Sequence, residues 1–312
     1  MGPRLHKPGV TGSSPAAAIG DASLTFSEPI NAYHSDREWW SKSQLWDLWA
    51  NGPLYFHGRY VSGRINSPFG APLVKGTRVH EWAEQGDEAW WSRVVEIPKT
   101  ALGKDGRSTK ATEEFISQTL ADKPDAICLG SDEIGEFRDQ FQQMLANPVF
   151  LRLQDQTEHR EFSVRGIDPE TGLKIRCRPD AAGCDFLWDI KTTKERRPLK
   201  TFWKSVVDYG YPMQAVLYLQ LCRQAGIAAK EFIFLVTSTV QPYECHAVTL
   251  PEALLDQARR DLRSTCVDLQ TRLLFDHWSA ADAGQITELV VPSWLIKEAK
   301  RHGHGSRNHW GE

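Results

Sequence analysis

Two carboxylates and a lysine stand close together in the segment RCRPDAAGCDFLWDIKTT, residues 176–193. Asp180 follows an Arg-Pro pair, and Asp189 precedes Lys191 by two positions. Alternate residues of a β-strand share one face, so Asp189 and Lys191 project together, while Ile190 points into the core and its carbonyl can face the site. If the chain turns back after Asp180, these oxygens converge as hard ligands for Mg²⁺ or Mn²⁺. The lysine could then hold or help deprotonate a water that attacks a phosphodiester.

The surroundings decide between this chemistry and a plain surface ion pair, which is the commoner origin of a bare Asp-x-Lys triplet. Here the triplet ends the apolar run FLWDIK, where solvated charges are unexpected. A strand that carries Glu161 precedes both segments, and we favour it as a further acidic residue over Glu158 because it stands at the strand start. Arg176 and Arg178 either bind phosphate or pair with these acidic residues.

Hydrophobic periodicity predicts the elements that position these residues. The alternating segments HREFSVRGID, LKIRCRPDA and FLWDIKTT predict three consecutive strands in a meander. Helices are predicted on either side of them, followed by two further strands. The order predicts an α/β fold with a mixed central sheet flanked by helices, plus a helical N-terminal portion. In that portion, Ser35 with Glu38 predicts a helix start, with Ser41 or Ser43 as alternatives, and the helix should stop at Asn51-Gly52-Pro53.

We expect one domain over residues 26–290. It would comprise a helical part over 33–150, a catalytic core over 151–250 and a long amphipathic helix over 251–275. Residues 1–25, rich in Gly, Pro, Ser and Ala, predict a flexible leader, and residues 100–113 predict a mobile loop. Residues 291–312 predict a frayed tail, whose histidines are not a metal tract.

Composition limits the class of protein. The 312 residues, 41% of them hydrophobic, are enough for a sizeable core, and the net charge of −3 leaves room for a local basic groove. The six cysteines show no C-x-x-C spacing, which argues against a zinc ribbon or an iron–sulfur cluster. No apolar run approaches the roughly 18 residues of a membrane span, and no signal-peptide core is evident. We therefore expect a cytoplasmic protein with reduced thiols and no membrane contact.

Twelve tryptophans are many for this length, and seven of them fall between residues 39 and 91. Aromatic core packing is the usual role of such residues. For an exposed minority, stacking on nucleic-acid bases is an alternative.

These motifs together resemble the PD-(D/E)xK nuclease superfamily, and most closely the RecE, or exonuclease VIII, type of phage and prophage exonuclease. The pair RPD…DIKTT is similar to the family's central motif. GTRVHEW is similar to its glycine-started helix, in which His80 occupies the metal-binding position. YPMQAVLYLQ carries the Q-x-x-x-Y signature of RecB-like nucleases at Gln214 and Tyr218. The resemblance runs from about residue 33 to 221, and several motifs in one order are far more specific than any alone.

The resemblance implies roles for each matching residue. Asp180 and Asp189 would be metal ligands, joined by the carbonyl of Ile190 and by His80. Glu161 would coordinate directly or through water. The metal would be Mg²⁺, for which Mn²⁺ can substitute.

The remaining residues would act on water and DNA. Lys191 would orient the attacking water and stabilise developing charge. Gln214 and Tyr218, one helical turn apart, would contact DNA or support the site. A DNA backbone track is predicted next to the site, at Arg176, Arg178, Lys194, Arg197 and Lys200.

The implied activity is degradation of the 5′-ended strand of linear double-stranded DNA, which leaves 3′ single-stranded overhangs for recombination by annealing. The resemblance also implies a homo-oligomeric ring and a single-strand annealing partner of the RecT type. One alternative is a RecB-like endonuclease or single-strand nuclease in DNA repair or phage defence. Another is a non-catalytic DNA-binding subunit, although such a protein would have no chemical reason to keep Asp180, Asp189 and Lys191 together.

Overall fold

The computed structural model describes residues 22–26, 28–66 and 72–279, together with six isolated positions between 286 and 297. Residues 1–21 of the predicted leader and most of the predicted tail, with its histidines, lie outside the described residues. Ala22–Thr25 form strand β1, which pairs antiparallel with β6 (Ser163–Ile167). The leader prediction is therefore wrong for these residues, because their backbone is bonded into a sheet.

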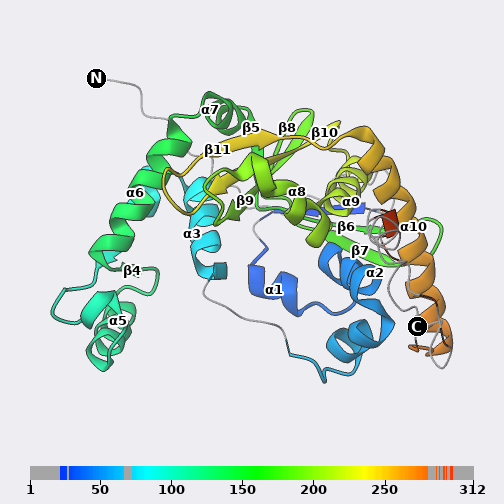
Figure 1. Cartoon of the computed structure of the whole chain (residues 1–312), viewed down its shortest axis with the longest axis horizontal. Helices are drawn as coiled ribbons and strands as arrows, with labels where there is room; N and C mark the ends of the chain where they lie inside the picture. Colours follow the sequence, from blue (N-terminus) through cyan, green and yellow to red (C-terminus); the bar gives the residue numbers. More distant parts are fainter. Residues whose placement is uncertain are drawn as a thin grey trace, which may run out of the picture.

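A five-stranded mixed sheet lies at the centre of the molecule (Figure 1) and confirms the predicted α/β class. Its spatial order is β11-β10-β9-β8-β5, with bounds β5 Thr157–Arg160, β8 Ala181–Gly183, β9 Phe186–Thr193, β10 Glu231–Ser238 and β11 Cys245–Val248. Strands β9 and β10 are parallel, and the other neighbours are antiparallel. Ala181 pairs with Trp188, so the same register continued brings Asp180 opposite Asp189.

A second sheet receives the strands that were predicted to continue the meander. Its order is β1-β6-β7-β2, where β7 is Lys174–Cys177 and β2 is Trp40–Ser41. The chain leaves β5 for this sheet at Glu161, whose φ of 47° breaks the extended backbone. The single three-stranded meander is therefore wrong, because one left-handed residue sends β6 and β7 into another sheet before β8 returns.

Helices cover both faces of the five-stranded sheet (Figure 1). One apolar cluster joins Trp188 and Ile190 of β9 to helices α3 Pro72–Gln85, α4 Asp87–Trp91, α6 Ser131–Leu145 and α7 Pro148–Asp155. The other joins Leu187 of β9 to helices α2 Lys42–Phe56, α8 Pro198–Asp208, α9 Tyr211–Gln224 and α10 Glu252–Phe275. Alternate residues of β9 thus serve opposite faces, as the period of a strand requires.

Helix α2 starts later than the prediction from Ser35 and stops later than the prediction from Asn51-Gly52-Pro53. Ser35 ends a short helix, α1 (Ile30–Ser35), whereas the alternative start at Ser41 is the cap of α2. The Ser41 N–H donates to Gln44 Oε1 at 2.8 Å, which completes a capping box. Gly52, with φ 81°, only kinks α2, which continues to Phe56 and then into η1 (His57–Val61). A glycine followed by proline has here produced a kink rather than an end.

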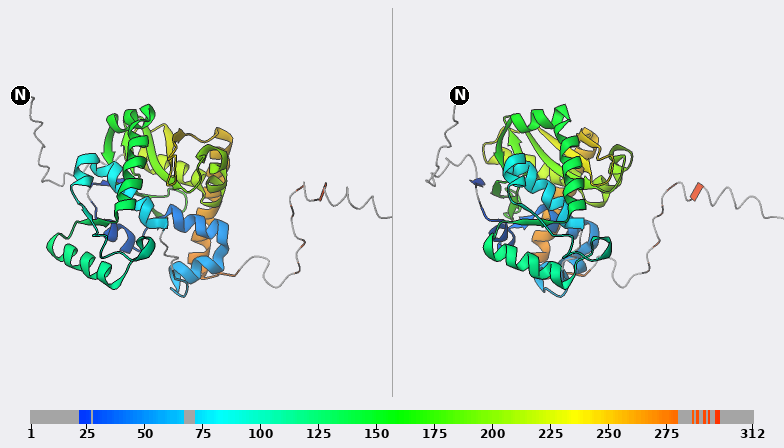
Figure 2. Two further views of the ribbon diagram at one scale, coloured as in Figure 1. Left: turned by 60° about the vertical axis from the view of Figure 1, so that its left-hand side comes forward. Right: turned by 90° about the vertical axis from the view of Figure 1, so that its left-hand side faces the viewer.

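The remaining elements form a projection from the central sheet. They are β3 Val94–Glu96, η2 Lys104–Gly106, α5 Lys110–Asp122 and β4 Ile127–Leu129. Figures 1 and 2 both place α5 at the end of α6 that is farther from the five-stranded sheet. The predicted loop over 100–113 therefore contains a helical turn and the start of α5. Among the described residues, no helix combines the length and apolar character needed to cross a bilayer.

Candidate active site

Three side chains that could hold a metal ion meet beside the edge of β8. His80 of α3, Glu161 and Asp180 each offer a ligand atom, and these atoms all lie within 4.8 Å of one another. His80 Nδ1 lies 3.0 Å from Asp180 Oδ2, and the Ile190 N–H donates to the same oxygen at 2.8 Å. The Glu161 N–H donates to the Asp180 carbonyl at 2.9 Å. We call these three residues, the histidine included, the acidic triad.

Helix α3 can deliver His80 to this point because Gly76 lets the helix approach β9 closely. A Cβ atom on Gly76 would lie 3.0 Å from Thr192 Oγ1, tighter than ordinary contact. The helix begins at Pro72 rather than at Gly76, so the expectation of a glycine-started helix is wrong, and His80 lies beyond the first turn. The glycine of the GTRVHEW motif serves packing between helix and strand rather than helix initiation.

Asp189 and Lys191 lie next to the acidic triad and pair with each other. Lys191 Nζ lies 2.5 Å from Asp189 Oδ2, and Gln214 Nε2 donates to Asp189 Oδ1 at 2.6 Å. Gln214 therefore occupies the supporting position, one of the two roles expected for it. The Lys191 ammonium also lies 4.9 Å from the ring centre of Tyr211. Because Asp189 is held by these partners, its role as a metal ligand stays a prediction.

The two aspartates carry opposite pKa shifts. For Asp189, burial and then repulsion from Asp180 raise the pKa above its ordinary value. For Asp180, burial also acts to raise the pKa, but the charge and hydrogen bond of His80 outweigh it, and the pKa is lowered. Asp180 is thus the carboxylate of this pair that ionises more readily, and its side chain is the more exposed of the two.

The other two members of the acidic triad hold protons unusually strongly. Burial, followed by the charge of Asp180, raises the pKa of Glu161 to about 7, although Arg178 opposes the shift. Burial acts to lower the pKa of His80, but Asp180 raises it to about 9. The protein thus concentrates negative charge that protons partly neutralise, as a bound cation also would.

The donor set fits a hard divalent cation. Two carboxylates supply oxygen, His80 supplies nitrogen, and the backbone of Ile190 runs directly beside Asp180. Mg²⁺ and Mn²⁺ prefer such oxygen-rich sites, and imidazole is compatible with Mn²⁺. Glu158, the rival of Glu161, is exposed on β5 and is not a member of the acidic triad.

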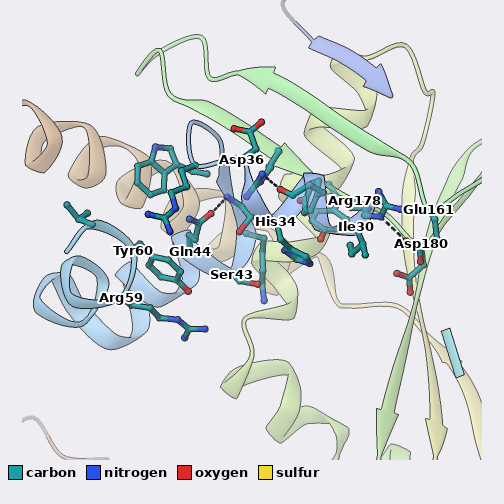
Figure 3. A pocket seen from close by; sticks show the side chains of 18 of the residues that line it. Ile30, His34, Asp36, Ser43, Gln44, Arg59, Tyr60, Glu161, Arg178 and Asp180 are labelled. Atoms are coloured by element: carbon teal, nitrogen blue, oxygen red, sulfur yellow. Dashed lines mark hydrogen bonds and ion pairs between the residues drawn. The ribbon is translucent and has the colours of Figure 1, made fainter. Parts of the chain in front are cut away.

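Two clefts open onto the acidic triad. The first has a volume of about 620 Å³ and runs from Asp180 to Tyr60 of η1 (Figure 3). The second has a volume of about 890 Å³ and is bordered by His80 and Lys191. Glu161 lines both clefts. The acidic triad is therefore reachable by an extended ligand from two directions.

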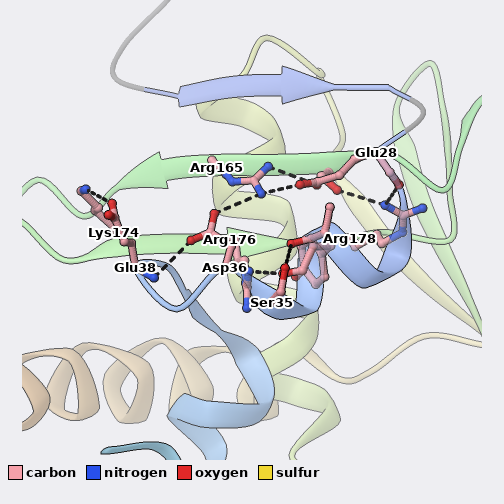
Figure 4. A network of polar contacts seen from close by, with 11 residues as sticks. Glu28, Ser35, Asp36, Glu38, Arg165, Lys174, Arg176 and Arg178 are labelled. Carbon is pink, nitrogen blue, oxygen red and sulfur yellow. Dashed lines mark hydrogen bonds and ion pairs between the residues drawn. The ribbon is translucent and has the colours of Figure 1, made fainter.

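A network of ion pairs fixes the N-terminal segment over these clefts (Figure 4). Arg165 holds Glu28 through contacts of 2.6 and 3.1 Å, and it reaches Asp36 at 3.4 Å. Arg178 donates to Glu161 Oε2 at 2.9 Å and to the Glu28 carbonyl at 3.0 Å. For Arg178 we expected either a phosphate contact or a pairing with the acidic residues, and the structure contains the pairing with Glu161. This pairing links the N-terminal segment to the acidic triad.

Arg176 has an internal partner instead of a free guanidinium. It is 4% exposed, lies 4.5 Å from the ring centre of Tyr33 and donates to the Tyr33 carbonyl. Arg176 also lines the first cleft, and a phosphate contact by this residue stays a prediction. By contrast, Lys194, Arg197 and Lys200 are exposed between the end of β9 and the first turn of α8.

Three further residues complete the site. Tyr218 lines the first cleft and packs edge-on against Phe232, and burial raises the pKa of its hydroxyl. Sequence reasoning missed Lys42 and Tyr211. Burial and then Lys191 lower the pKa of the Lys42 ammonium to about 7. Tyr211 stands at the start of the Q-x-x-x-Y helix, which could have drawn attention to it. Lys42 stands in the N-terminal segment YHSDREWWSKSQLWDLWANGPLYF, residues 33–56, which also resembles the family but singles out no lysine.

Comparisons with known proteins agree on the fold. A family model described as the PD-(D/E)XK nuclease superfamily matches residues 40–283. A solved structure from Eubacterium rectale, described as "Putative exonuclease", is similar over 87% of this chain and 97% of its own, with a TM-score of 0.55 and 12% identity. A second, described as SSO0001, covers 50% of this chain and 87% of its own at 15% identity, and its TM-score of 0.25 carries no argument. No curated protein matches the chain.

Proposed function

The chain belongs to the PD-(D/E)XK nuclease superfamily, and from this premise we propose that it is a Mg²⁺-dependent exodeoxyribonuclease of the RecE type. Its substrate would be the 5′-ended strand of linear double-stranded DNA, and its product a 3′ single-stranded overhang. Mn²⁺ would substitute for Mg²⁺. The solved structure from Eubacterium rectale is the protein described as an exonuclease. For this chain, the order of the sequence motifs supports the same activity.

The observation that carries the proposal is the acidic triad beside Lys191. Ligand atoms of His80, Glu161 and Asp180 within 4.8 Å of one another form a cation site, and Lys191 lies on the adjacent strand, ion-paired with Asp189. A cation site alone would be unremarkable on a protein surface. A lysine held in an ion pair next to such a site can orient the attacking water and stabilise the developing charge, which phosphodiester hydrolysis uses.

Each residue then has a task that follows from its position. When bound, a divalent cation would polarise a phosphate oxygen. The acidic triad would hold that cation, and the ion pair with Asp189 keeps the Lys191 ammonium fixed, so that it can orient a water toward phosphorus and stabilise the negative charge that develops. Gln214 holds Asp189 from the opposite side and thereby sets the position of this ion pair.

End-labelled linear duplex DNA, incubated with the protein and Mg²⁺ beside a closed circular duplex, tests the proposal. We expect mononucleotides from the 5′-ended strand of the linear DNA only, and none from the Asp189→Ala variant. Cutting of the closed circular duplex would contradict the exonuclease proposal and favour the RecB-like endonuclease. Absence of cleavage with either Mg²⁺ or Mn²⁺ would contradict the catalytic proposal and favour a non-catalytic DNA-binding subunit.

Assembly is a separate part of the proposal. A ring around DNA would explain a net charge of −3 in a DNA-processing enzyme, because the cations would be gathered on the channel side. Lys194, Arg197 and Lys200 would contribute to that side. A single-strand annealing protein of the RecT type would receive the overhang. Mass measurement in solution tests the ring, and a monomer at working concentration would contradict it.

A further inference from the structure

Exposed aromatic rings line a path that leads outward from Lys191. Tyr211 lies under the Lys191 ammonium, and Tyr209 lies beside Tyr211 with ring centres 5.9 Å apart. Tyr209 is 58% exposed although it is a large aromatic residue. Rings of this size usually lose most of their exposed area on folding, so an exposed one next to a catalytic lysine invites a functional explanation.

A second aromatic pair stands next to the first and belongs to another part of the chain. Trp46 and Trp49 of α2 stack with ring centres 4.8 Å apart and planes 23° from parallel, and Trp49 is 48% exposed. Lys42 joins the two pairs, since its ammonium lies 5.9 Å from the Trp46 ring centre and 5.8 Å from that of Tyr211. One ring of each pair thus contacts the Lys42 side chain.

The backbone between α8 and α9 is shaped to hold this arrangement. Trp46 Nε1 donates to the Asp208 carbonyl at 3.2 Å, and Lys42 donates to the Tyr209 carbonyl. Gly210, with φ 60°, faces Trp46 so closely that a Cβ atom would lie 2.2 Å from its ring. Only glycine combines that backbone with that contact. The two pairs therefore occupy a fixed relative position rather than a chance one.

We propose that Trp49 and Tyr209 bind the unpaired nucleotides of the DNA substrate by stacking with their bases, while Trp46 and Tyr211, which pack against these two rings, hold them in place. This inference rests on the proposed function, and it adds that the enzyme grips a single strand next to the catalytic lysine. Base stacking on aromatic rings tolerates any sequence, as processive degradation demands. The exposed cations Lys194, Arg197 and Lys200, between the end of β9 and the first turn of α8, are available to the backbone phosphates.

Nucleic acid suits this surface better than a protein partner does. Tyr211 lines the second cleft together with Lys191 and contacts Tyr209, so the aromatic pairs begin at the cleft that holds the proposed catalytic lysine. A nucleotide strand offers flat bases for the rings and phosphates for the exposed cations Lys194, Arg197 and Lys200, whereas an apolar protein surface offers no anionic group for these cations.

Fluorescence anisotropy of a labelled oligothymidylate of about 12 nucleotides, in a chelator that stops cleavage, tests the inference. We expect Trp49→Ala and Tyr209→Ala each to raise Kd about tenfold. Trp49→Phe should stay within about threefold of wild type, because a flat ring remains. The matched control is Phe275→Ala at the end of α10, which removes a ring that is 74% exposed but lies outside this path. Its Kd should be unchanged.

The salt dependence of Kd separates stacking from charge. Trp49→Ala should keep the wild-type slope of log Kd against log salt, because no phosphate contact is lost. Unchanged Kd in both alanine variants, with wild-type melting temperatures, would overturn the inference. So would a change in oligomer mass without a change in Kd, because the rings would then bind a second copy of the chain.

The binding assay also stands apart from the proposed function. If the wild-type protein binds the oligonucleotide through Trp49 and Tyr209 but cleaves no DNA, the stacking inference holds and the nuclease proposal fails. If linear DNA is cleaved normally and both variants keep wild-type Kd, the nuclease proposal holds and the stacking inference fails.

Discussion

Both faces of the five-stranded sheet carry an apolar cluster, and the face covered by α9 also carries the polar side chains that hold Asp189. On the face covered by α3, α6 and α7, Trp82 and Phe141 stack at 4.1 Å within a buried apolar cluster. On the face covered by α9 and approached by α2, Asp189, Lys191 and Gln214 form a buried polar group. A rigid aromatic layer fixes α3, which carries His80, whereas the polar layer positions the residues that would meet DNA. The aromatic contacts that fix α3 and the polar contacts that hold Asp189 therefore lie on opposite faces of the sheet.

Strand β9 makes this division possible. Its Trp188 and Ile190 enter the aromatic layer, while Leu187, Asp189 and Lys191 face α9. The backbone of Ile190 nevertheless donates to Asp180 and so ties the two sides at the acidic triad. Disturbing either side should therefore have separable effects, which substitutions can measure.

The largest effect is expected where the two faces meet. Asp180→Ala removes the carboxylate that joins His80 to the Ile190 backbone, and we expect the cleavage rate of linear duplex DNA to fall by about 10³-fold or more. Lys191→Ala should have a similar effect. Initial rates and thermal melts together measure the result. Glu158→Ala, an exposed carboxylate on β5, is the matched control and should keep full activity. Full activity in Asp180→Ala would refute the site assignment.

A smaller loss is expected from the polar layer alone. Gln214→Leu removes the hydrogen bond to Asp189 but keeps the side-chain volume, and kcat should fall by about 10- to 100-fold with the acidic triad intact. Steady-state kinetics on linear DNA measure it. The control is Gln220→Leu, an exposed glutamine on the same helix. Equal kcat values for the two variants would mean that the Gln214 contact does not position Asp189.

The free energy of unfolding should depend on pH through His80, which α3 carries on the face with the aromatic cluster. In chelator, the pKa of His80 in the folded protein is raised to about 9 from 6.5, so its stabilising contribution is complete below pH 6.5 and is lost as pH rises through 9. Between pH 7.5 and 9.5 the free energy of unfolding of the wild type should fall by about 1–2 kcal/mol relative to that of His80→Asn, because the lowered pKa of Lys42 raises stability with pH equally in both proteins. Glu161, whose pKa is about 7, is already largely ionised over this range. Thermal or urea unfolding of wild type and His80→Asn provides the measurement, and parallel curves would contradict the expected role of His80.

The smallest effect is expected at the exposed cations beside α8. Lys200→Ala should weaken binding of duplex DNA only a few-fold and reduce the slope of log Kd against log salt by about one. Titrations at several salt concentrations measure both quantities. Lys110→Ala on α5, which removes a side chain that is 90% exposed, should change neither. If the two variants behave alike, the predicted backbone track does not include Lys200.

Local patterns in the sequence were sufficient for much of the central sheet. The apolar run ending in Asp189 and Lys191 predicted β9 and the shared face of these side chains, because a strand alternates by two whatever surrounds it. The long apolar periodicity after residue 250 predicted α10 to within one residue. Patterns of this kind fail where one residue departs from them. Glu161 looks like any strand residue, yet its left-handed backbone moves β6 and β7 into a second sheet.

The sequence by itself determined which chemical groups are available: the carboxylates, the lysine and the histidine, together with the motif order that marks their family. Only the tertiary structure decided their partners. It placed Glu161 rather than Glu158 in the acidic triad, enclosed Arg176 against Tyr33, and brought Lys42 beside Lys191 and Tyr211. The physical reason is that motifs record local spacing along the chain. Burial, ion pairing and ring contacts depend on segments far apart in the sequence, whose meeting is settled by packing of the whole fold.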